Sequence, residues 1–384
     1  MPQVVPRVRS VFAPVTALAF KATQWDDLKA FLERQAEHTE LIPISDASQL
    51  LMTADGRLAE SGYRFNYLGF QSLANGISTG LCSVFCELSR ENYQRTNNEI
   101  EPDLASAITI YNTAVRSRID ALRERTLLVD HRERLVEGFM GLNHRMLDNS
   151  TFLELVQTEV AACQPRAQFH RAELVGRDLT LYYTDPQTAR KDIYAQAGHS
   201  IVGGWLFNNR EDRGKAIQAV LCLLTRFGAA REKARANSRL MHTGSDLAGR
   251  AAIMVGRALG RELDMTTVLA QLANLQAKTL GFTDDHKKLE EAYQPWLEFL
   301  CRSGVLQVDA KSIMRNTALV GADLTPRDVV DAFNNNVLTN RTAYDLLCTI
   351  LRFARNEPSG NRERLQGLAM EMLCPQRRKR RTKE

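Results

Sequence analysis

The sequence lacks the short motifs by which many enzymes are recognised. It contains no Gly-x-Gly-x-x-Gly or HExxH signature, and its seven histidines and seven cysteines are scattered along the chain. Residues 244–251 have the glycine spacing of a phosphate-binding loop, but Arg250 and Ala251 stand where lysine and serine or threonine are needed. We therefore predict helix capping for this segment. We assign no catalytic residue, metal ligand or cofactor, and favour a non-enzymatic protein over an enzyme.

Long apolar runs are also missing. The longest uncharged stretch that resembles one, residues 193–209, is broken by polar side chains and three glycines, whereas a membrane helix needs about 18 or more apolar residues. The apolar run after Arg7 and Arg9 is interrupted by Pro14 and Thr16, and an odd number of cysteines argues against export. We expect a cytoplasmic protein with no membrane partner.

The composition is that of an ordinary globular protein. Among 384 residues, 44% are hydrophobic and 25% are charged, which excludes a disordered or collagenous chain. The cysteines are interpreted as small buried residues. Because residues 81–88 place Cys82, Val84 and Cys86 on one face at a spacing of two, we expect a strand there.

The order of periodic segments predicts an α+β fold with a helical N-terminal region, a central and mostly antiparallel sheet, and a helical C-terminal region. The boundaries we expect are 1–120, 121–244 and 245–374, followed by a basic disordered tail at 375–384. Predicted helices cover 25–38, 67–77, 245–260, 265–280, 283–304, a segment starting near 325, 341–356 and 361–373. Predicted strands cover 126–131, 135–140, 167–174, 178–184 and 200–207, with a hairpin turn at Gly176-Arg177-Asp178.

Charge is distributed unevenly along the chain. The last eight residues carry the whole net charge of +5, so the remainder is formally neutral. Residues 26–60 hold eight acidic and three basic side chains, and this segment should repel a phosphate backbone. Residues 226–257 hold seven basic and two acidic side chains, so an anionic partner should meet this stretch.

Two groups of residues are therefore candidates for nucleic-acid contact. The first combines cations with aromatic side chains that are able to stack on bases, namely Arg226, Arg231, Lys233, Arg235, Arg239, His242, Trp205 and Phe227. The second is the basic tail, Arg377, Arg378, Lys379, Arg380 and Arg381. Competing interpretations remain open: Trp205 and Phe227 as core residues, the basic run as a solvated helix face, and the tail as a nuclear localisation signal or a non-functional terminus.

Several segments are similar to an uncharacterised family of phage- and plasmid-encoded proteins found on prophages and conjugative elements. The segments that carry this resemblance are 206–214, 217–222, the basic stretch ending at 242–244, 340–347 and 365–373. Many members have Asn-Gly after the cysteine, where this chain has Leu223-Leu224. The resemblance implies a mobile genetic element and work on DNA. A mixed sheet with a basic groove is also similar in outline to phage single-strand annealing proteins.

From these observations we expect a non-enzymatic nucleic-acid-binding protein that prefers single-stranded DNA and promotes strand annealing. Annealing proteins often form rings, so a homo-oligomer is a further expectation, although nothing in the sequence specifies a subunit interface. Two alternatives stay open: a protein-interaction or host-takeover factor, and a cryptic metal-dependent nuclease assembled from distant carboxylates.

Overall fold

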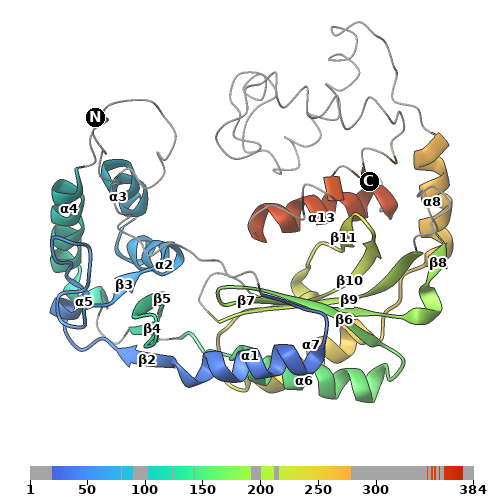
Figure 1. Cartoon of the computed structure of the whole chain (residues 1–384), viewed down its shortest axis with the longest axis horizontal. Coiled ribbons are helices and arrows are strands. Elements are labelled where there is room, and N and C mark those ends of the chain that lie inside the picture. Colours follow the sequence, from blue (N-terminus) through green and yellow to red (C-terminus); the bar gives the residue numbers. More distant parts are fainter. Residues whose placement is uncertain are drawn as a thin grey trace, which may run out of the picture.

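The computed structural model describes most of residues 20–277 and part of 344–374. Within the first range, residues 79, 90–102, 123–124, 142, 192–199 and 212–215 are excluded, and the second range comprises 344, 347, 348, 350, 351, 354 and 359–374. This part of the chain has an α+β fold built on two sheets, one large and one small (Figure 1). None of its helices combines the length and the apolar content that a membrane crossing requires.

The large sheet has the strand order β1-β6-β7-β9-β10-β11, with β12 pairing to β10 and β8 to β9. All of these neighbours are antiparallel, which confirms the predicted central sheet. The strands are β1 (Phe20–Ala22), β6 (Gln168–Val175), β7 (Asp178–Thr184), β8 (Arg190–Lys191), β9 (Ser200–Arg210), β10 (Ile217–Thr225), β11 (Gly228–Arg231) and β12 (Arg239–Leu240). The predicted turn between β6 and β7 is present, and Gly176 there has a φ of 60°, which glycine adopts without strain.

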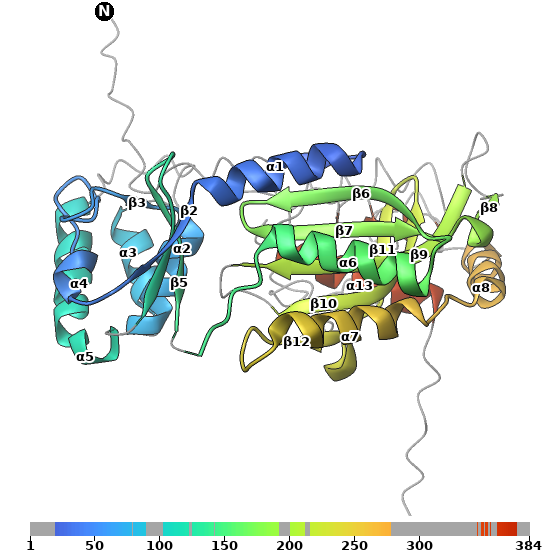
Figure 2. The same cartoon turned by 90° about the horizontal axis from the view of Figure 1, so that it is seen from below.

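Three helices cover one face of the large sheet: α1 (Trp25–Glu37), α6 (Asn149–Cys163) and α7 (Leu247–Leu259) (Figure 2). Their apolar sides pack on alternate residues of the strands, among them Leu181, Trp205 and Phe207. The N-terminus of α7 is capped by the Asp246 carboxylate, which accepts from the Gly249 amide at 3.1 Å, in line with the helix capping predicted for residues 244–251.

Two further helices, α8 (Met265–Ala277) and α13 (Ser359–Leu373), pack together with the described helical residues between 344 and 354. Their common core includes Leu223 of β10 and Ala230 of β11, so they cover the β10–β11 side of the large sheet. Asp264 caps α8, since its carboxylate accepts from the Thr267 amide at 3.1 Å. The helices predicted at 283–304 and from 325 lie outside the described residues.

The small sheet has the order β2-β4-β5-β3 and carries its own apolar core. Its strands are β2 (Thr39–Pro43), β3 (Arg64–Phe65), β4 (Thr126–Asp130) and β5 (Leu135–Met140), and its helices are α2 (Tyr67–Ile77), α3 (Leu81–Ser89), α4 (Leu104–Ser117) and α5 (Ile119–Leu122). Strands from both sides of residue 120 meet in this sheet, so a boundary there divides one structural unit. The N-terminal region is therefore not purely helical.

The segment 81–88 is helical, which corrects the expected strand. Leu81, Cys82, Phe85 and Cys86 form its buried side, while Val84 is 42% exposed. These buried positions recur every three to four residues, which is the helical period. The predicted burial of both cysteines is confirmed.

One buried arginine joins the two sheets. Arg177 follows β6, and its guanidinium lies 2.5 Å from Glu137 of β5 in the small sheet and 3.1 Å from Glu211 at the end of β9. Its side chain is only 3% exposed, so this cation is almost fully desolvated. The two carboxylates raise the pKa of Arg177 against the opposing effect of its burial.

Candidate nucleic-acid interface

The chain after β11 runs along α7 and is attached to it at both ends. At one end the Arg261 guanidinium donates to the Glu232 carboxylate at 2.8 Å. At the other end the Arg250 guanidinium donates to the Thr243 carbonyl. The segment 232–243 and helix α7 therefore lie side by side.

Four cations on these two elements are exposed to solvent: Lys233, Arg235 and Arg239 on the segment, and Arg257 on α7. Among the described residues, none forms an ion pair with any of the four. An exposed cation with no carboxylate partner keeps its charge available for a phosphate. We call these four residues the basic edge.

Two large apolar side chains accompany the basic edge. Ile253 is 56% exposed and stands on α7 three residues after Arg250 and four before Arg257, so these three side chains share one helix face. Met241 is 55% exposed and directly follows β12. The surface thus alternates positive and apolar groups, a combination that suits a ligand with both phosphates and exposed bases.

Arg226 and Phe227 lie at the turn between β10 and β11, at the other end of β11 from Lys233. The Arg226 guanidinium is exposed and sits 4.9 Å from the centre of the Phe227 ring. Phe227 is partly buried against the core formed with α8 and α13. Arg226 therefore extends the positive surface, whereas the Phe227 ring already has protein and guanidinium neighbours.

Trp205 is a core residue, which corrects the expectation that it stacks on bases. Its side chain is 1% exposed, and its indole Nε1 donates to the carbonyls of Ala258 and Arg261 at 3.0 Å each. The Ala258 carbonyl also accepts from the Arg261 amide at 3.1 Å, so the indole reinforces the hydrogen bonds at the C-terminal end of α7. The ring fixes the end of α7 to the sheet.

His242 is likewise buried, at 3% exposure, and does not belong to the interface. Its ring stacks on His144 with centroids 5.2 Å apart, and its Nδ1 donates to the Arg145 carbonyl at 3.2 Å. Burial, together with the neighbouring His144, lowers the pKa of His242 to about 4. The imidazole is therefore neutral at pH 7 and carries no charge for a phosphate.

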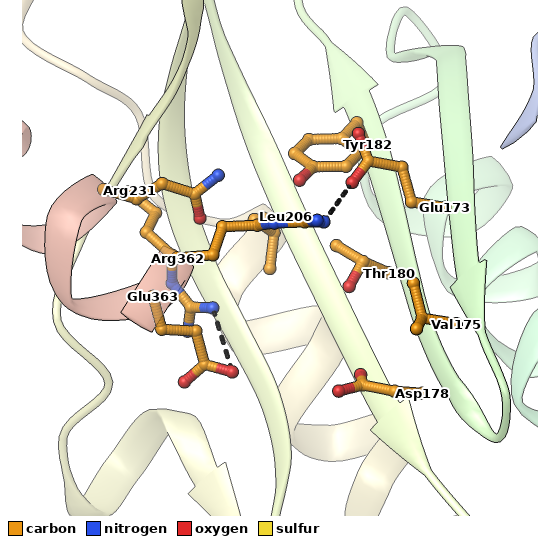
Figure 3. A pocket seen from close by; sticks show the side chains of 10 residues that line it. Glu173, Val175, Asp178, Thr180, Tyr182, Leu206, Arg231, Arg362 and Glu363 are labelled. Carbon is orange, nitrogen blue, oxygen red and sulfur yellow. Dashed lines mark hydrogen bonds and ion pairs between the residues drawn. The ribbon is translucent and has the colours of Figure 1, made fainter. Parts of the chain in front are cut away.

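Arg231 is directed into the protein as well. It is 4% exposed, donates to the Gln218 side chain, and lies 3.9 Å from Glu363 of α13 (Figure 3). Beside it, Arg362 of α13 lies 2.6 Å from Glu173 of β6. These pairs line a polar cavity of about 20 Å³ between the sheet and α13, which has room for about one water molecule. Arg231 therefore holds α13 on the sheet.

The basic tail, with Arg377, Arg378, Lys379, Arg380 and Arg381, lies outside the described residues. Of the other predicted contacts, Lys233, Arg235 and Arg239 are all exposed on the segment after β11. The structure adds Arg257 and Ile253, which the sequence reasoning missed. The positive charge excess that extends to residue 257 could have identified Arg257, and the helical spacing of positions 250, 253 and 257 could have identified Ile253.

Comparison with known proteins finds no family model, curated protein or solved structure that the chain matches. In the described part of the chain, no three His, Cys, Asp or Glu side chains gather in a way that would hold a metal ion. The interface is accordingly defined by the geometry and charge of the basic edge.

Proposed function

We propose that this protein binds single-stranded nucleic acid, with DNA as the favoured form, along the basic edge. The observation that carries the proposal is the gathering of four exposed cations, Lys233, Arg235, Arg239 and Arg257, without an ion-pair partner among the described residues. Phosphates placed there release condensed counterions, which is the main source of sequence-independent affinity.

The apolar neighbours of the cations support a single strand over a duplex. Ile253 and Met241 offer contact surface for the faces of bases, and base faces are accessible only where strands are unpaired. In a duplex these faces are stacked inside the helix, and an exposed isoleucine beside a phosphate would gain nothing.

The decisive experiment compares the full chain with a variant in which Lys233, Arg235, Arg239 and Arg257 are all changed to Gln. Fluorescence anisotropy of a labelled single strand, measured at about 50 and about 200 mM salt, gives affinity and salt dependence. Each lost phosphate contact should reduce the slope of log K against log salt by about 0.7, so we expect a reduction of up to about 3.

A matched control removes four exposed arginines from other elements, Arg34, Arg116, Arg118 and Arg132. The control has the same net charge as the variant, so equal losses in both would show a general charge effect and refute the basic edge. A full chain that binds a duplex as tightly as a single strand would refute the strand preference.

The tail is tested separately with a chain that ends at Cys374. We expect binding to persist with a smaller salt slope, because the tail adds six cations but no apolar contacts. Loss of all binding would place the site in the tail and overturn the proposal.

Strand annealing and a role on a mobile element are finer parts of the same proposal. The mobile-element role rests on the resemblance of several segments to phage- and plasmid-encoded proteins, and annealing rests on the outline similarity to phage single-strand annealing proteins. Mixing two complementary strands, one with a fluorophore and one with a quencher, measures annealing directly. Acceleration by the full chain but not by the fourfold Gln variant is the expected result.

A further inference from the structure

A second site lies on the small sheet, away from the basic edge. A cavity of about 170 Å³ is lined by apolar side chains of β2, β4 and β5, namely Ile42, Leu127, Val129 and Val136, and by Leu58. Its polar lining includes Gln49, Glu60, Ser61 and Tyr63. Cavities of about 150 Å³ with apolar walls hold a benzene ring, so the space suits one small ring or a branched alkyl group.

A chain of hydrogen bonds orients one polar group on the wall of this cavity. His131 pairs through Nε2 with the Glu40 carboxylate, and its Nδ1 lies 2.5 Å from the Tyr63 hydroxyl. An ionised carboxylate only accepts, so Nε2 donates to Glu40; with the imidazole neutral, Nδ1 accepts and the Tyr63 hydroxyl donates. In that state the Tyr63 oxygen keeps its lone pairs available to accept a hydrogen bond from a ligand.

Glu60 provides a negative charge at the same cavity. Its carboxylate is exposed, and it makes no hydrogen bond or ion pair with any described residue. The nearby Arg134 guanidinium is held by wall residues of the cavity, since it donates to the Ser61 carbonyl at 2.8 Å and lies 5.9 Å from the centre of the Tyr63 ring. Besides this cation, the polar rim presents the Tyr63 oxygen and the unpaired Glu60 carboxylate next to an apolar space.

We propose that this cavity is a binding site for a small primary amine with a compact apolar group. The ammonium meets the Glu60 carboxylate and the Tyr63 oxygen, while a ring or branched chain occupies the space between Ile42, Leu58 and Leu127. An ammonium group supplies three donors and no acceptor, which matches the polar rim. The Glu40–His131 pair acts through Tyr63 as a positioning device and does not touch the ligand.

Four probes that share a benzene ring test the proposal by isothermal titration of the full chain at neutral pH: benzylammonium, benzyl alcohol, toluene and benzoate. We expect affinity to fall in that order, with no measurable binding of benzoate, because its carboxylate would face Glu60 and an acceptor oxygen. Equal affinity for benzylammonium and benzoate would overturn the proposal, as would the absence of binding by all four.

Variants assign the contacts one by one. Glu60→Gln should weaken benzylammonium about threefold to tenfold and leave benzyl alcohol unchanged, since an exposed charge pair contributes modestly. Tyr63→Phe should weaken both ligands and leave toluene unchanged, because the ring stays and only the hydroxyl is lost. A loss of toluene binding in Tyr63→Phe would show that the hydroxyl has a structural role only, and would overturn its assignment.

Two controls keep the result specific. Glu37→Gln changes the net charge in the same way at an exposed position at the end of α1, and it should have no effect on any probe. Ile42→Phe fills the cavity from a partly exposed position on β2 and should abolish binding of every probe, with folding verified by its melting temperature. Unchanged binding in a folded Ile42→Phe variant would place the probes elsewhere and refute the site.

Discussion

At the scale of single residues, burial decides which charges remain available. His242 and Arg231 belong to the most basic stretch of the described chain, yet both point into the protein. His242 also connects distant segments, since its backbone carbonyl accepts from the Arg145 amide at 2.9 Å and its ring donates back to the Arg145 carbonyl. The buried His242 therefore has a structural role, and its burial makes the stability of the folded protein depend on pH.

The consequence follows from the difference in proton affinity between the folded and unfolded states. In the unfolded chain an imidazole takes up its proton near the ordinary pKa of 6.5, whereas in the folded state His242 takes it up only near pH 4. Between these values the unfolded state binds more protons, so stability must decline as the pH falls. The loss is at most about 3 kcal/mol.

We therefore expect the free energy of unfolding to decrease between pH 6.5 and pH 4 in the wild type, and to decrease less in His242→Asn. Asparagine keeps a donor for the Arg145 carbonyl but does not titrate. Urea denaturation across this pH range measures both proteins. Identical pH profiles would show that His242 is not the responsible group.

At the scale of elements, close backbone approach determines how α2 lies on the small sheet. A Cβ built on Gly69 would come within 2.4 Å of the Val136 carbonyl oxygen of β5, a distance that side chains do not tolerate. Gly76 on the same helix faces the Phe139 ring, and its Cβ would be 3.1 Å from an aromatic carbon. The helix can touch β5 only because residue 69 has no side chain.

This pair of glycines gives a controlled test. Replacing glycine by alanine in a helix is favourable by about 1 kcal/mol. Whether the variant is more or less stable overall therefore depends on whether the new methyl group fits against its neighbours. We expect Gly69→Ala to destabilise the protein by about 2 kcal/mol or more, and Gly76→Ala to stay within about 1 kcal/mol of the wild type. Thermal and urea denaturation measure the stability of both variants. Equal losses of stability in Gly69→Ala and Gly76→Ala would contradict the expectation.

At the scale of the whole molecule, a buried charge network connects the apolar core of the small sheet to the apolar cores of the large sheet. One core surrounds the small sheet, and the others pack on the large sheet. Arg177 stands between them with Glu137 on one side and Glu211 on the other. Removing one member of a buried ion pair leaves the others desolvated without compensation, which typically costs about 3–5 kcal/mol.

We expect Arg177→Ala to lose about 3–5 kcal/mol and to unfold in two steps instead of one. Trp25 and Trp205 both belong to the core of the large sheet, so in a chain that also carries Trp296→Phe the tryptophan fluorescence reports on that part, whereas far-ultraviolet circular dichroism reports on both sheets. In Arg177→Ala the fluorescence and circular dichroism signals should change at different denaturant concentrations. As a control, Arg132→Ala removes an exposed ion pair and should change the free energy of unfolding by less than about 0.5 kcal/mol. If the fluorescence and circular dichroism transitions of Arg177→Ala coincide, the bridging role of Arg177 is contradicted.

Part of the fold could be predicted from local sequence patterns. The helix from Trp25 and the strands from Thr126 to Met140 were predicted within one residue, because their buried positions follow a single period. The segment 81–88 was assigned wrongly because its apolar residues fit both periods. Only the exposure of Val84 distinguishes a helix from a strand there, and exposure depends on packing with α2 and α4.

Only part of the nucleic-acid interface could be predicted from the sequence. The excess of positive charge over 226–257 is a property of the sequence, and it led to Lys233, Arg235 and Arg239. The sequence could not separate these from Arg231, because the carboxylate that neutralises Arg231 comes from Glu363, far along the chain. The same holds for Trp205, whose partners are carbonyls at the end of α7.

The sequence by itself therefore determined the α+β class, the positions of strands β4, β5, β6, β7 and β9 and of helices α1, α2, α7, α8 and α13, and the location of the positive charge along the chain, because these depend on neighbours within a few residues. The tertiary structure decided which cations face solvent, which strands meet in the small sheet, and where Glu40, His131 and Tyr63 form one hydrogen-bonded chain beside a cavity. Such groupings depend on long-range contacts, and desolvation energies change by several kcal/mol according to what packs over a side chain.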